Sequence, residues 1–493
     1  MTEWPHWLPI LAVLPLVGGA LTPLLFHRRP VAAWFWAVSV AAATTLVAMT
    51  LLLKLIASGG LSYAVGGWLP QYGIELRFDE IGAFALPASL LVLLSLSFSR
   101  HYVARAVDSG RISFYYALIL INLGGLNGFL ITGDLFNLFV FMEIFSVSAY
   151  ALVATAREPV AALAALKYLF LGALSSLLVL FSVGVVFAMT GTLNIEDAAA
   201  DLDLSTPMPA ALALAGLATG FAVKAALFPV HFWLPDAHAA APAPVSAILS
   251  ALVVKAGVVG LLRTLELFAG GEGLLQPMLN SIVWLGALGA LGGALMALVQ
   301  RDIKLMLAYS TVANIGYILI GLGLSTASAT TGAMIHVVNH AVIKVLLFLA
   351  AGAFIHRTGL RCIDDLRGLA RRMPFTAFAM GVGLVSLSGV PPMAGFVGKW
   401  QIAVGALQAG RPILVAVLVI AGLLVLAFSV RVTNAMYFRP PSRISAAAAT
   451  EAPVSMLFPL LVLTAGCFGL GMAGQVMLRF VAPAVPGLYG GIP

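Results

Sequence analysis

Charged residues are scarce in this 493-residue chain: Asp, Glu, Lys and Arg together make up 9% of it, whereas 61% of the residues are hydrophobic. Soluble domains usually contain about 25% charged residues. This shortage of charge excludes a soluble domain of any size. Apolar stretches of about 20 residues, each long enough to cross a bilayer, fill nearly the whole sequence instead.

Cysteine is equally rare. The two cysteines, Cys362 and Cys467, form no Cys-x-x-Cys motif, which excludes iron–sulfur clusters and cysteine-based zinc sites. No glycine-rich phosphate loop of the P-loop kind occurs either. We therefore expect no cofactor, no metal and no enzymatic activity of the chain's own. Any driving force must come from an ion gradient or from partner subunits.

The apolar stretches predict an all-α polytopic membrane protein with about fourteen transmembrane helices. The first stretch, 7–26, is followed at once by another, so we expect a membrane helix there and not a cleaved signal. The predicted division of the chain is helices one to three in 1–111, four to eight in 112–268, nine to thirteen in 269–438, and the last helix in 439–493.

The basic residues are distributed unevenly between successive loops. If the N-terminus lies outside, the inward-facing loops carry sixteen Lys and Arg residues and the outward-facing loops carry five. The positive-inside rule then predicts a multi-pass protein of the bacterial inner membrane with both termini outside. Because the basic loops are short and separated by spans, nucleic acid is not an expected partner.

Prolines interrupt two of the predicted helices, the seventh and the twelfth. Pro229 and Pro235 belong to a group of four prolines within sixteen residues, and Pro391 and Pro392 are adjacent. Proline removes a backbone donor and clashes with the preceding turn, so neither segment is a regular helix. Irregular backbone at membrane depth is tolerated only inside protein or beside a wet cavity.

The two breaks are five helices apart. A five-helix repeat must be inverted because five is odd, and matching broken helices in two inverted halves indicate a transport site. We therefore predict two inverted five-helix repeats. The alternative is a pair of unrelated proline kinks.

Five charged residues lie inside predicted spans. Four are lysines from a total of seven, namely Lys224, Lys255, Lys344 and Lys399, and the fifth is Glu143. A charge at the bilayer centre costs about 2.5–3.5 kcal/mol on insertion scales. A purely structural protein would avoid this cost, so the pattern favours a path for protons or other ions. Glu143 has Lys224 as its natural partner, either as a static ion pair or as one that opens and closes.

Histidines accompany these lysines. His336, His340 and Lys344 are spaced i, i+4, i+8, which places them on one helical stripe about 12 Å long. A hydrogen-bonded proton relay is the preferred interpretation. Packing histidines are the alternative, and zinc is disfavoured because no third ligand is evident. His238 follows the first break and is a candidate bridge between the lysines on either side of it.

Four stretches in this order resemble the antiporter-like subunits of respiratory complex I and of Mrp-type cation/proton antiporters: 224–255, 300–317, 336–344 and 389–399. The resemblance covers most of the chain and implies fourteen helices in two inverted halves. It also implies a proton relay made of Glu143 as the fifth-helix acid, Lys224 as its partner, Lys255 as the central lysine, His238, His336, His340 and Lys344 as connectors, and Lys399 as the terminal lysine.

The run 133–143 looks most similar to the D-type subunit of Mrp antiporters, whereas 336–340 looks closer to complex I and hydrogenase forms. The leading hypothesis is a proton-translocating subunit of a multisubunit Mrp-type Na⁺(K⁺)/H⁺ antiporter, with other membrane subunits, protons, Na⁺ or K⁺, and the lipid bilayer as partners. The alternative is the corresponding proton-pumping subunit of complex I or of a membrane-bound energy-converting hydrogenase. A stand-alone carrier of small anions is disfavoured because the lysines are spread over four helices.

Overall fold

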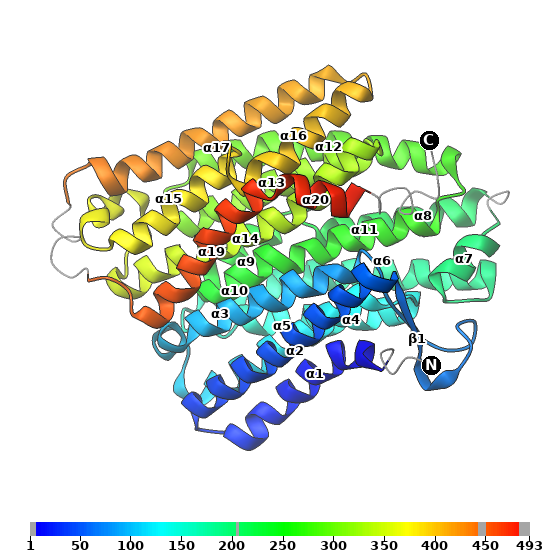
Figure 1. The fold of residues 1–493 in the computed structure, drawn as a ribbon, viewed down its shortest axis with the longest axis horizontal. Coiled ribbons are helices and arrows are strands. Elements are labelled where there is room, and N and C mark those ends of the chain that lie inside the picture. Colours follow the sequence, from blue (N-terminus) through cyan, green and yellow to red (C-terminus); the bar gives the residue numbers. More distant parts are fainter. Residues whose placement is uncertain (1–5, 204–206, 442–449, 483–493) are drawn as a thin grey trace.

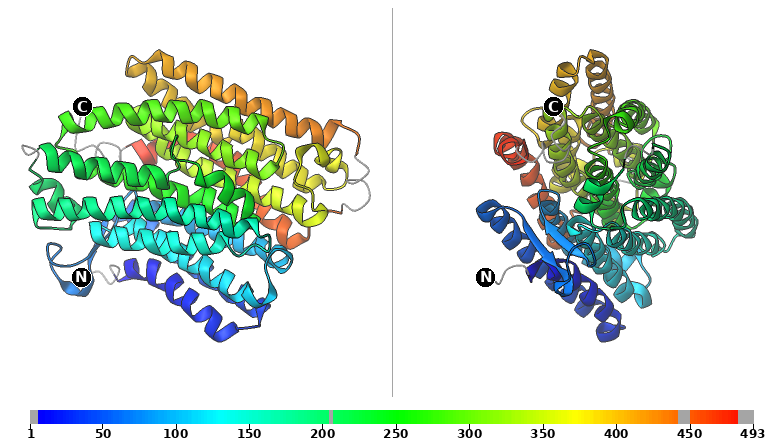
Figure 2. Two further views of the ribbon diagram at one scale, coloured as in Figure 1. Left: turned by 180° about the vertical axis from the view of Figure 1, so that it is seen from behind. Right: turned by 90° about the vertical axis from the view of Figure 1, so that its right-hand side faces the viewer.

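The computed structural model describes residues 6–203, 207–441 and 450–482. It confirms an all-α membrane protein. Helices run side by side along the long axis of the molecule, and Figure 2 shows many of them nearly end on. In the described residues, twelve helices are long and apolar enough to cross a membrane. The long unbroken helices are α1 (Trp7–Phe26), α2 (Pro30–Ser58), α3 (Ala85–Ala106), α4 (Ile112–Ile131), α5 (Leu135–Val153), α6 (Val160–Thr190), α12 (Glu272–Val299), α13 (Ile303–Gly323), α14 (Ala327–Thr358), α17 (Pro412–Phe438) and α19 (Val454–Met472).

Two further membrane segments are each divided into two helices. The first consists of α8 (Pro207–Lys224) and α9 (Trp233–Ala240), and the second of α15 (Pro374–Ser388) and α16 (Ala394–Gln408). Pro229, Pro391 and Pro392 lie in the non-helical connections, whereas Pro235 lies in the first turn of α9. α15 ends at Gly389, whose φ of 81° is a left-handed conformation that favours glycine.

A third irregular helix is not expected from the sequence. α10 (Ala243–Ile248) continues through a π-helical turn, Leu249–Val253, into α11 (Val254–Leu267). No proline or glycine marks the π turn, and the whole segment is buried inside the bundle. π turns of this kind occur frequently at functional sites.

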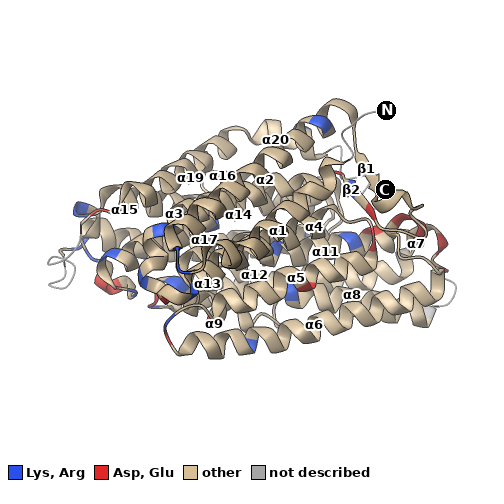
Figure 3. Ribbon diagram, turned by 90° about the horizontal axis from the view of Figure 1, so that it is seen from below, with Lys and Arg blue, Asp and Glu red and all other residues tan. Residues whose placement is uncertain are grey.

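The loops gather at two ends of the bundle, and charged residues mark both (Figure 3). One end carries the short helix α7 (Ile195–Asp201) and an antiparallel hairpin of β1 (Leu61–Ala64) and β2 (Glu75–Phe78). The other end carries most of the basic loops, and there Arg361 pairs with Asp302. The amphipathic helix α20 (Gly474–Val481) follows α19.

The broken and bulged segments lie in the middle of the molecule. In Figure 1, α1 and α2 lie along one side of the bundle and α16 and α17 along the opposite side, with α11, α13 and α14 between them. Small residues permit close packing there. A Cβ atom at Gly257 of α11 would lie only 2.3 Å from the backbone nitrogen of Ala225. The backbone of α11 is therefore in direct contact with the backbone at the start of the first break.

Candidate functional site

The first part of the site is formed by one face of α5. Glu143, Ser146 and Tyr150 are spaced i, i+3, i+7 and therefore share that face. The carboxylate of Glu143 accepts a hydrogen bond from Ser176 of α6. Lys224, the last residue of α8, is buried. Its amine donates one hydrogen bond to the Ser146 hydroxyl at 2.7 Å and another to the Tyr150 hydroxyl at 3.0 Å. The structure thus brings Glu143 and Lys224 to one helix face, but each is bound to hydroxyl groups and not to the other.

The first break is held in place by aromatic residues. The indole nitrogen of Trp233, at the start of α9, donates to the Val223 carbonyl at 3.0 Å. Its ring stacks on Tyr168 of α6 with 4.0 Å between ring centroids. These contacts satisfy one backbone carbonyl freed by the break and fix the end of α8. Lys224 is thereby presented to α5 from a rigid support.

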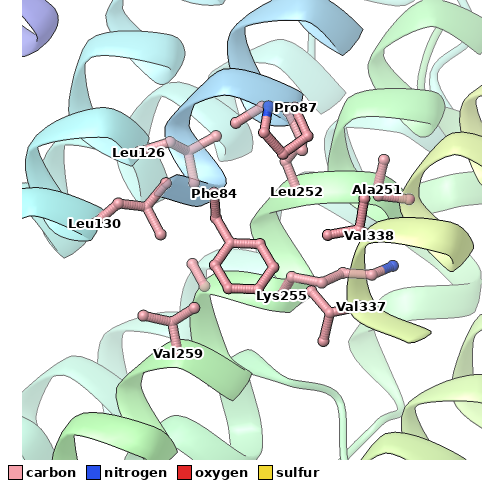
Figure 4. Close-up of a pocket in the computed structure, with 13 residues that line it drawn as sticks. Phe84, Pro87, Leu126, Leu130, Ala251, Leu252, Lys255, Val259, Val337 and Val338 are labelled. Atoms are coloured by element: carbon pink, nitrogen blue, oxygen red, sulfur yellow. The ribbon is translucent and has the colours of Figure 1, made fainter. Parts of the chain in front are cut away.

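Lys255 lies two residues beyond the π turn. Its amine donates to the backbone carbonyl of Ser250, inside that turn, and the Ser250 hydroxyl shares a 2.8 Å hydrogen bond with Thr311 of α13. Figure 4 shows Lys255 in a narrow pocket beside Phe84, with its amine directed toward Val337 and Val338 of α14. The π turn therefore connects the central lysine to both α13 and α14.

His238 of α9 is fully buried, and neither nitrogen of its ring has a hydrogen-bond partner within the described residues. It lies within electrostatic range of three lysines, Lys255, Lys304 and Lys344. An imidazole whose ring nitrogens are both unpartnered has one site to accept a proton and, when protonated, a site to release one. Its expected role as a connector stays a prediction.

Lys304 follows Asp302 in the sequence, and the two together look like charges that begin a helix. Asp302 does cap α13, accepting hydrogen bonds from two backbone amides. The side chain of Lys304, however, is only 3% exposed and donates to the carbonyls of Ala239, at 3.1 Å, and Ala241 at the end of α9. Lys304 is therefore a further buried lysine, in contact with the end of α9. Because Lys304 lies far from the centre of any apolar run, its burial cannot be recognised from the sequence.

The stripe on α14 is entirely buried and faces α13. The Nε2 atom of His336 lies 3.0 Å from Oδ1 of Asn314, and its ring stacks on that of His340 with 5.8 Å between centroids. Both ring nitrogens of His340 lack a partner among the described residues. Lys344 donates to the Leu307 carbonyl at 2.6 Å and to the Ser310 hydroxyl.

In the described ranges no three His, Cys, Asp or Glu side chains come together in a way that would hold a metal ion.

Lys399 belongs to α16, just after the second break. Its amine donates to the Leu387 carbonyl, in the last turn of α15, at 2.7 Å, and lies 4.6 Å from the ring centroid of Tyr317. The amine of Lys399 therefore turns into the protein and does not extend to the membrane surface. A cation at this place is favoured because the carbonyls at a helix C-terminus carry partial negative charge.

The titratable groups form a row across the bundle, from α5 through α11 and α14 to α16. Lys224, Lys255, His340 and Lys344 are buried, and Glu143 and Lys399 at its ends are half-buried. His340 lies within electrostatic range of Lys255, Lys344 and Lys399. Sequence reasoning missed the polar residues that hold these groups. Their only sequence signal is helical spacing relative to a charged residue. They are Ser146, Tyr150, Ser176, Ser250, Asn314 and Ser310.

Comparison with known proteins gives three concordant results. The family model "NADH:quinone oxidoreductase/Mrp antiporter, TM" matches residues 132–425. The chain is 38% identical to NADH-quinone oxidoreductase subunit N of Desulforudis audaxviator, over 97% of this chain and 98% of that protein. It is 30% identical to the D-type Na⁺/H⁺ antiporter subunit of Bacillus subtilis, over 85% of this chain and 84% of that protein.

Among solved structures, the chain is similar to a chain of the Mrp complex from Dietzia sp. DQ12-45-1b. The TM-score is 0.90 at 26% sequence identity, and the match covers 100% of this chain and 98% of that one. The similarity extends over both broken helices and every buried charged residue described above.

Proposed function

We propose, because this chain belongs to the NADH:quinone oxidoreductase/Mrp antiporter family, that it is a proton-translocating subunit of a multisubunit membrane complex. The observation that carries the proposal is the row of buried amines and imidazoles across the bundle. Burying titratable residues in membrane spans costs free energy, and a function in proton transport explains why the chain contains them.

In the proposed path, protons move between Lys224, Lys255 and Lys399 through His238 and the α14 stripe. Each amine and each imidazole takes up and releases one proton. The unpartnered ring nitrogens of His238 and His340 supply the acceptor and donor sites that a relay requires. The order of the helices gives the path a lateral course through the middle of the bundle.

The Glu143–Lys224 pair is proposed to regulate this path. In the arrangement described, Lys224 is held by Ser146 and Tyr150, which corresponds to an open pair. Closing the pair would bring opposite charges together and stabilise the protonated form of Lys224. Opening it would release that proton toward Lys255.

For the complex, the first candidate is a Mrp-type Na⁺(K⁺)/H⁺ antiporter in the bacterial inner membrane, in which this chain transports ions and catalyses no reaction of its own. The fold agreement with the Mrp complex over the whole chain supports it. The second candidate is a redox-driven proton pump such as complex I or a membrane-bound hydrogenase. The 38% identity to a subunit N over nearly the full length favours that alternative.

The deciding experiment is to purify the chain with its native partners and identify them by mass spectrometry. Co-purified membrane subunits without metal centres, together with a Na⁺- or K⁺-dependent ΔpH in vesicles, would support the antiporter. Iron–sulfur or nickel-containing partners would support the redox-driven pump. A chain that purifies alone and moves no protons in proteoliposomes would refute the proposal.

We further propose that helices four to eight (112–268) and nine to thirteen (269–438) form two inverted halves. A repeated local feature supports this. Asp134 caps α5 and pairs by a backbone bridge with Asn194, 60 residues further on. Asp302 caps α13 and pairs with Cys362, also 60 residues further on. The two bridges lie at opposite ends of the bundle, as an inverted repeat requires.

The proposed topology places both termini outside. The start of α1 lies at the hairpin end, where His6 contacts Tyr63, and α19 runs away from the opposite, basic end, where His101 hydrogen bonds to Ser455. The basic end is inside by the positive-inside rule. A cysteine-labelling scan of Ser62 and Ser109 variants in intact cells tests this topology. Labelling of the Ser109 variant but not of the Ser62 variant would contradict this topology and indicate the opposite orientation in the membrane.

A further inference from the structure

A basic pocket opens at the inner end of the bundle, away from the lysine row. It has a volume of about 440 Å³ and is lined by the ends of five elements, α2, α3, α4, α14 and α19. Its polar lining includes Arg100, His101 and Arg105 of α3 and His356 and Arg357 of α14. No Asp or Glu belongs to the lining of this pocket among the described residues. The pocket is therefore positively charged and without an internal counter-charge.

The three arginines retain donors that are free for a ligand. Arg100 lies over the Trp34 ring at 5.2 Å. Among the described residues, Arg105 uses one terminal nitrogen for the His356 carbonyl at 2.8 Å, and Arg357 uses its Nε for the Thr450 carbonyl at 3.0 Å. A guanidinium group has five N–H donors, so most of them remain.

Other arginines at the same end behave differently. Arg157, Arg361, Arg367 and Arg439 each lie within 3.5 Å of a carboxylate oxygen. In the described part of the chain, none of the three pocket arginines has such a partner. Among the described residues, the charge of the pocket arginines is thus not neutralised by a carboxylate, whereas that of these four arginines is.

The pocket continues into two apolar stripes. Val31 of α2 lines it, and Phe35 follows one turn further into the span; both are exposed. Pro453 lines it from the other side, and Val454 and Phe458 of α19 follow, also exposed. Cationic donors at the membrane surface are thereby continuous with apolar side chains that point outward from the bundle.

We infer that this pocket binds the phosphate headgroup of an anionic phospholipid of the inner leaflet, with the acyl chains lying along α2 and α19. Arginine suits this role because its planar donors bind phosphate oxygens in pairs. Basic pockets between transmembrane helices on the cytoplasmic side are known to hold such headgroups. The apolar stripes distinguish a lipid from free phosphate, which would not use them.

The test compares lipid retention by the purified full chain, in whatever complex it forms, by native mass spectrometry. After delipidation, phosphatidylglycerol and phosphatidylcholine with identical acyl chains are titrated back. The pocket variant is Arg100→Gln/Arg105→Gln/Arg357→Gln. The matched control, Arg301→Gln/Arg371→Gln/Arg372→Gln, removes the same charge from the same end outside the pocket.

Phosphatidylglycerol should bind the control as it binds the unmodified chain, and the pocket variant at least about tenfold more weakly, because several charge-assisted hydrogen bonds are lost. Equal binding by the two variants, or equal binding of the two lipids, would overturn the inference. Displacement of bound phosphatidylglycerol by millimolar inorganic phosphate would overturn the inference and assign the pocket to soluble phosphate. A partner polypeptide that cross-links to position 105 would also overturn it and assign the pocket to a protein contact.

If the glutamine variant does not assemble, the triple Arg→Lys variant takes its place. Lysine keeps the charge but loses the paired donors. It should assemble and still retain less phosphatidylglycerol than an Arg→Lys control at positions 301, 371 and 372. Unchanged retention would again overturn the inference.

Discussion

Lys224 donates a hydrogen bond from its amine to the hydroxyl of Tyr150, with 3.0 Å between nitrogen and oxygen. Tyr150 lies two helical turns beyond Glu143 on the same face of α5. The amine is therefore held between Ser146, one turn from the acid, and Tyr150, two turns from it. Tyr150 is a positioning residue for the proposed opening and closing of the Glu143–Lys224 pair.

Replacing Tyr150 with Phe should slow proton transport by roughly tenfold, equivalent to about 1.4 kcal/mol, because Lys224 loses one of its two neutral anchors. The ring remains to pack against Tyr168. Tyr115→Phe is the matched control, since the Tyr115 hydroxyl is buried and has no hydrogen-bond partner among the described residues. ΔpH formation in vesicles measures both. Equal rates for the two variants would contradict a positioning role.

Glu143→Gln should abolish transport while the complex still assembles. Glutamine retains an oxygen that accepts the hydrogen bond from Ser176, but it cannot form a charged pair with Lys224. Quenching of a pH-sensitive dye in vesicles reports transport, and size-exclusion chromatography reports assembly. Glu80→Gln, on an exposed loop residue, serves as the control. Full transport by Glu143→Gln would refute the proposed regulation.

His340→Leu separates a relay residue from a packing residue. Because His340 makes no hydrogen bond within the described structure, its replacement by an apolar side chain should leave the melting temperature unchanged or raise it. Transport should nevertheless fall at least about tenfold, the scale of losing one proton-transfer group. His336→Leu is the comparison, since it also loses the bond to Asn314 and should lower stability. Normal transport by His340→Leu would favour the packing interpretation.

Lys304→Met should lower the free energy of unfolding by about 1.5–3 kcal/mol, because two carbonyls at the end of α9 lose a charged donor. Denaturation in detergent measures the change. Lys167→Met is the control: Lys167 pairs with Asp236 at 2.7 Å, but both side chains are about half exposed, and such pairs contribute about 0–1 kcal/mol. An equal loss in both variants would argue against the buried capping role.

The hairpin end should become less stable in acid. Burial by itself would raise the pKa of Asp79, but Arg263 and Arg77, together with the Gly82 amide, lower it below the ordinary value. Since the folded-state pKa is the lower one, the stabilisation is complete above the unfolded pKa of about 3.9 and is lost as the pH falls through the folded-state value.

Proteolysis of the 59–74 loop at pH 7 and at pH 3 measures the effect. The unmodified chain should be cleaved faster at low pH, and Asp79→Asn should be cleaved equally fast at both values after correction for the activity of the protease. Cleavage of the unmodified chain that does not change with pH would contradict this account.

The formation of apolar membrane helices follows from length and apolarity, which are local properties, and the sequence therefore predicts it. The breaks around Pro229 and Pro391 are also visible, since proline acts on its own backbone. The π turn before Lys255 is not, because residues 249–253 carry no proline or glycine. Packing against neighbouring helices allows an extra residue there.

The candidate site divides in the same way. A charged residue inside an apolar run is conspicuous, so Glu143, Lys224, Lys255 and Lys344 can be selected from the sequence alone. The hydroxyl groups that hold them cannot, since serine and tyrosine are ordinary residues in membrane helices. The burial of Lys304 cannot be predicted from the sequence for a related reason. It depends on α9, which is distant in the sequence and packs over the Lys304 side chain.

Apolar length and isolated charge are properties of single segments, and from them the amino-acid sequence establishes a membrane protein with titratable groups inside its spans. Which of these groups face one another is a property of the folded chain. The fold places the Lys224 amine on Tyr150 and not on Glu143, aligns the α14 stripe with α13, and joins five helix ends into one basic pocket. These relationships depend on how helices distant in the sequence pack side by side, and no local pattern specifies that packing.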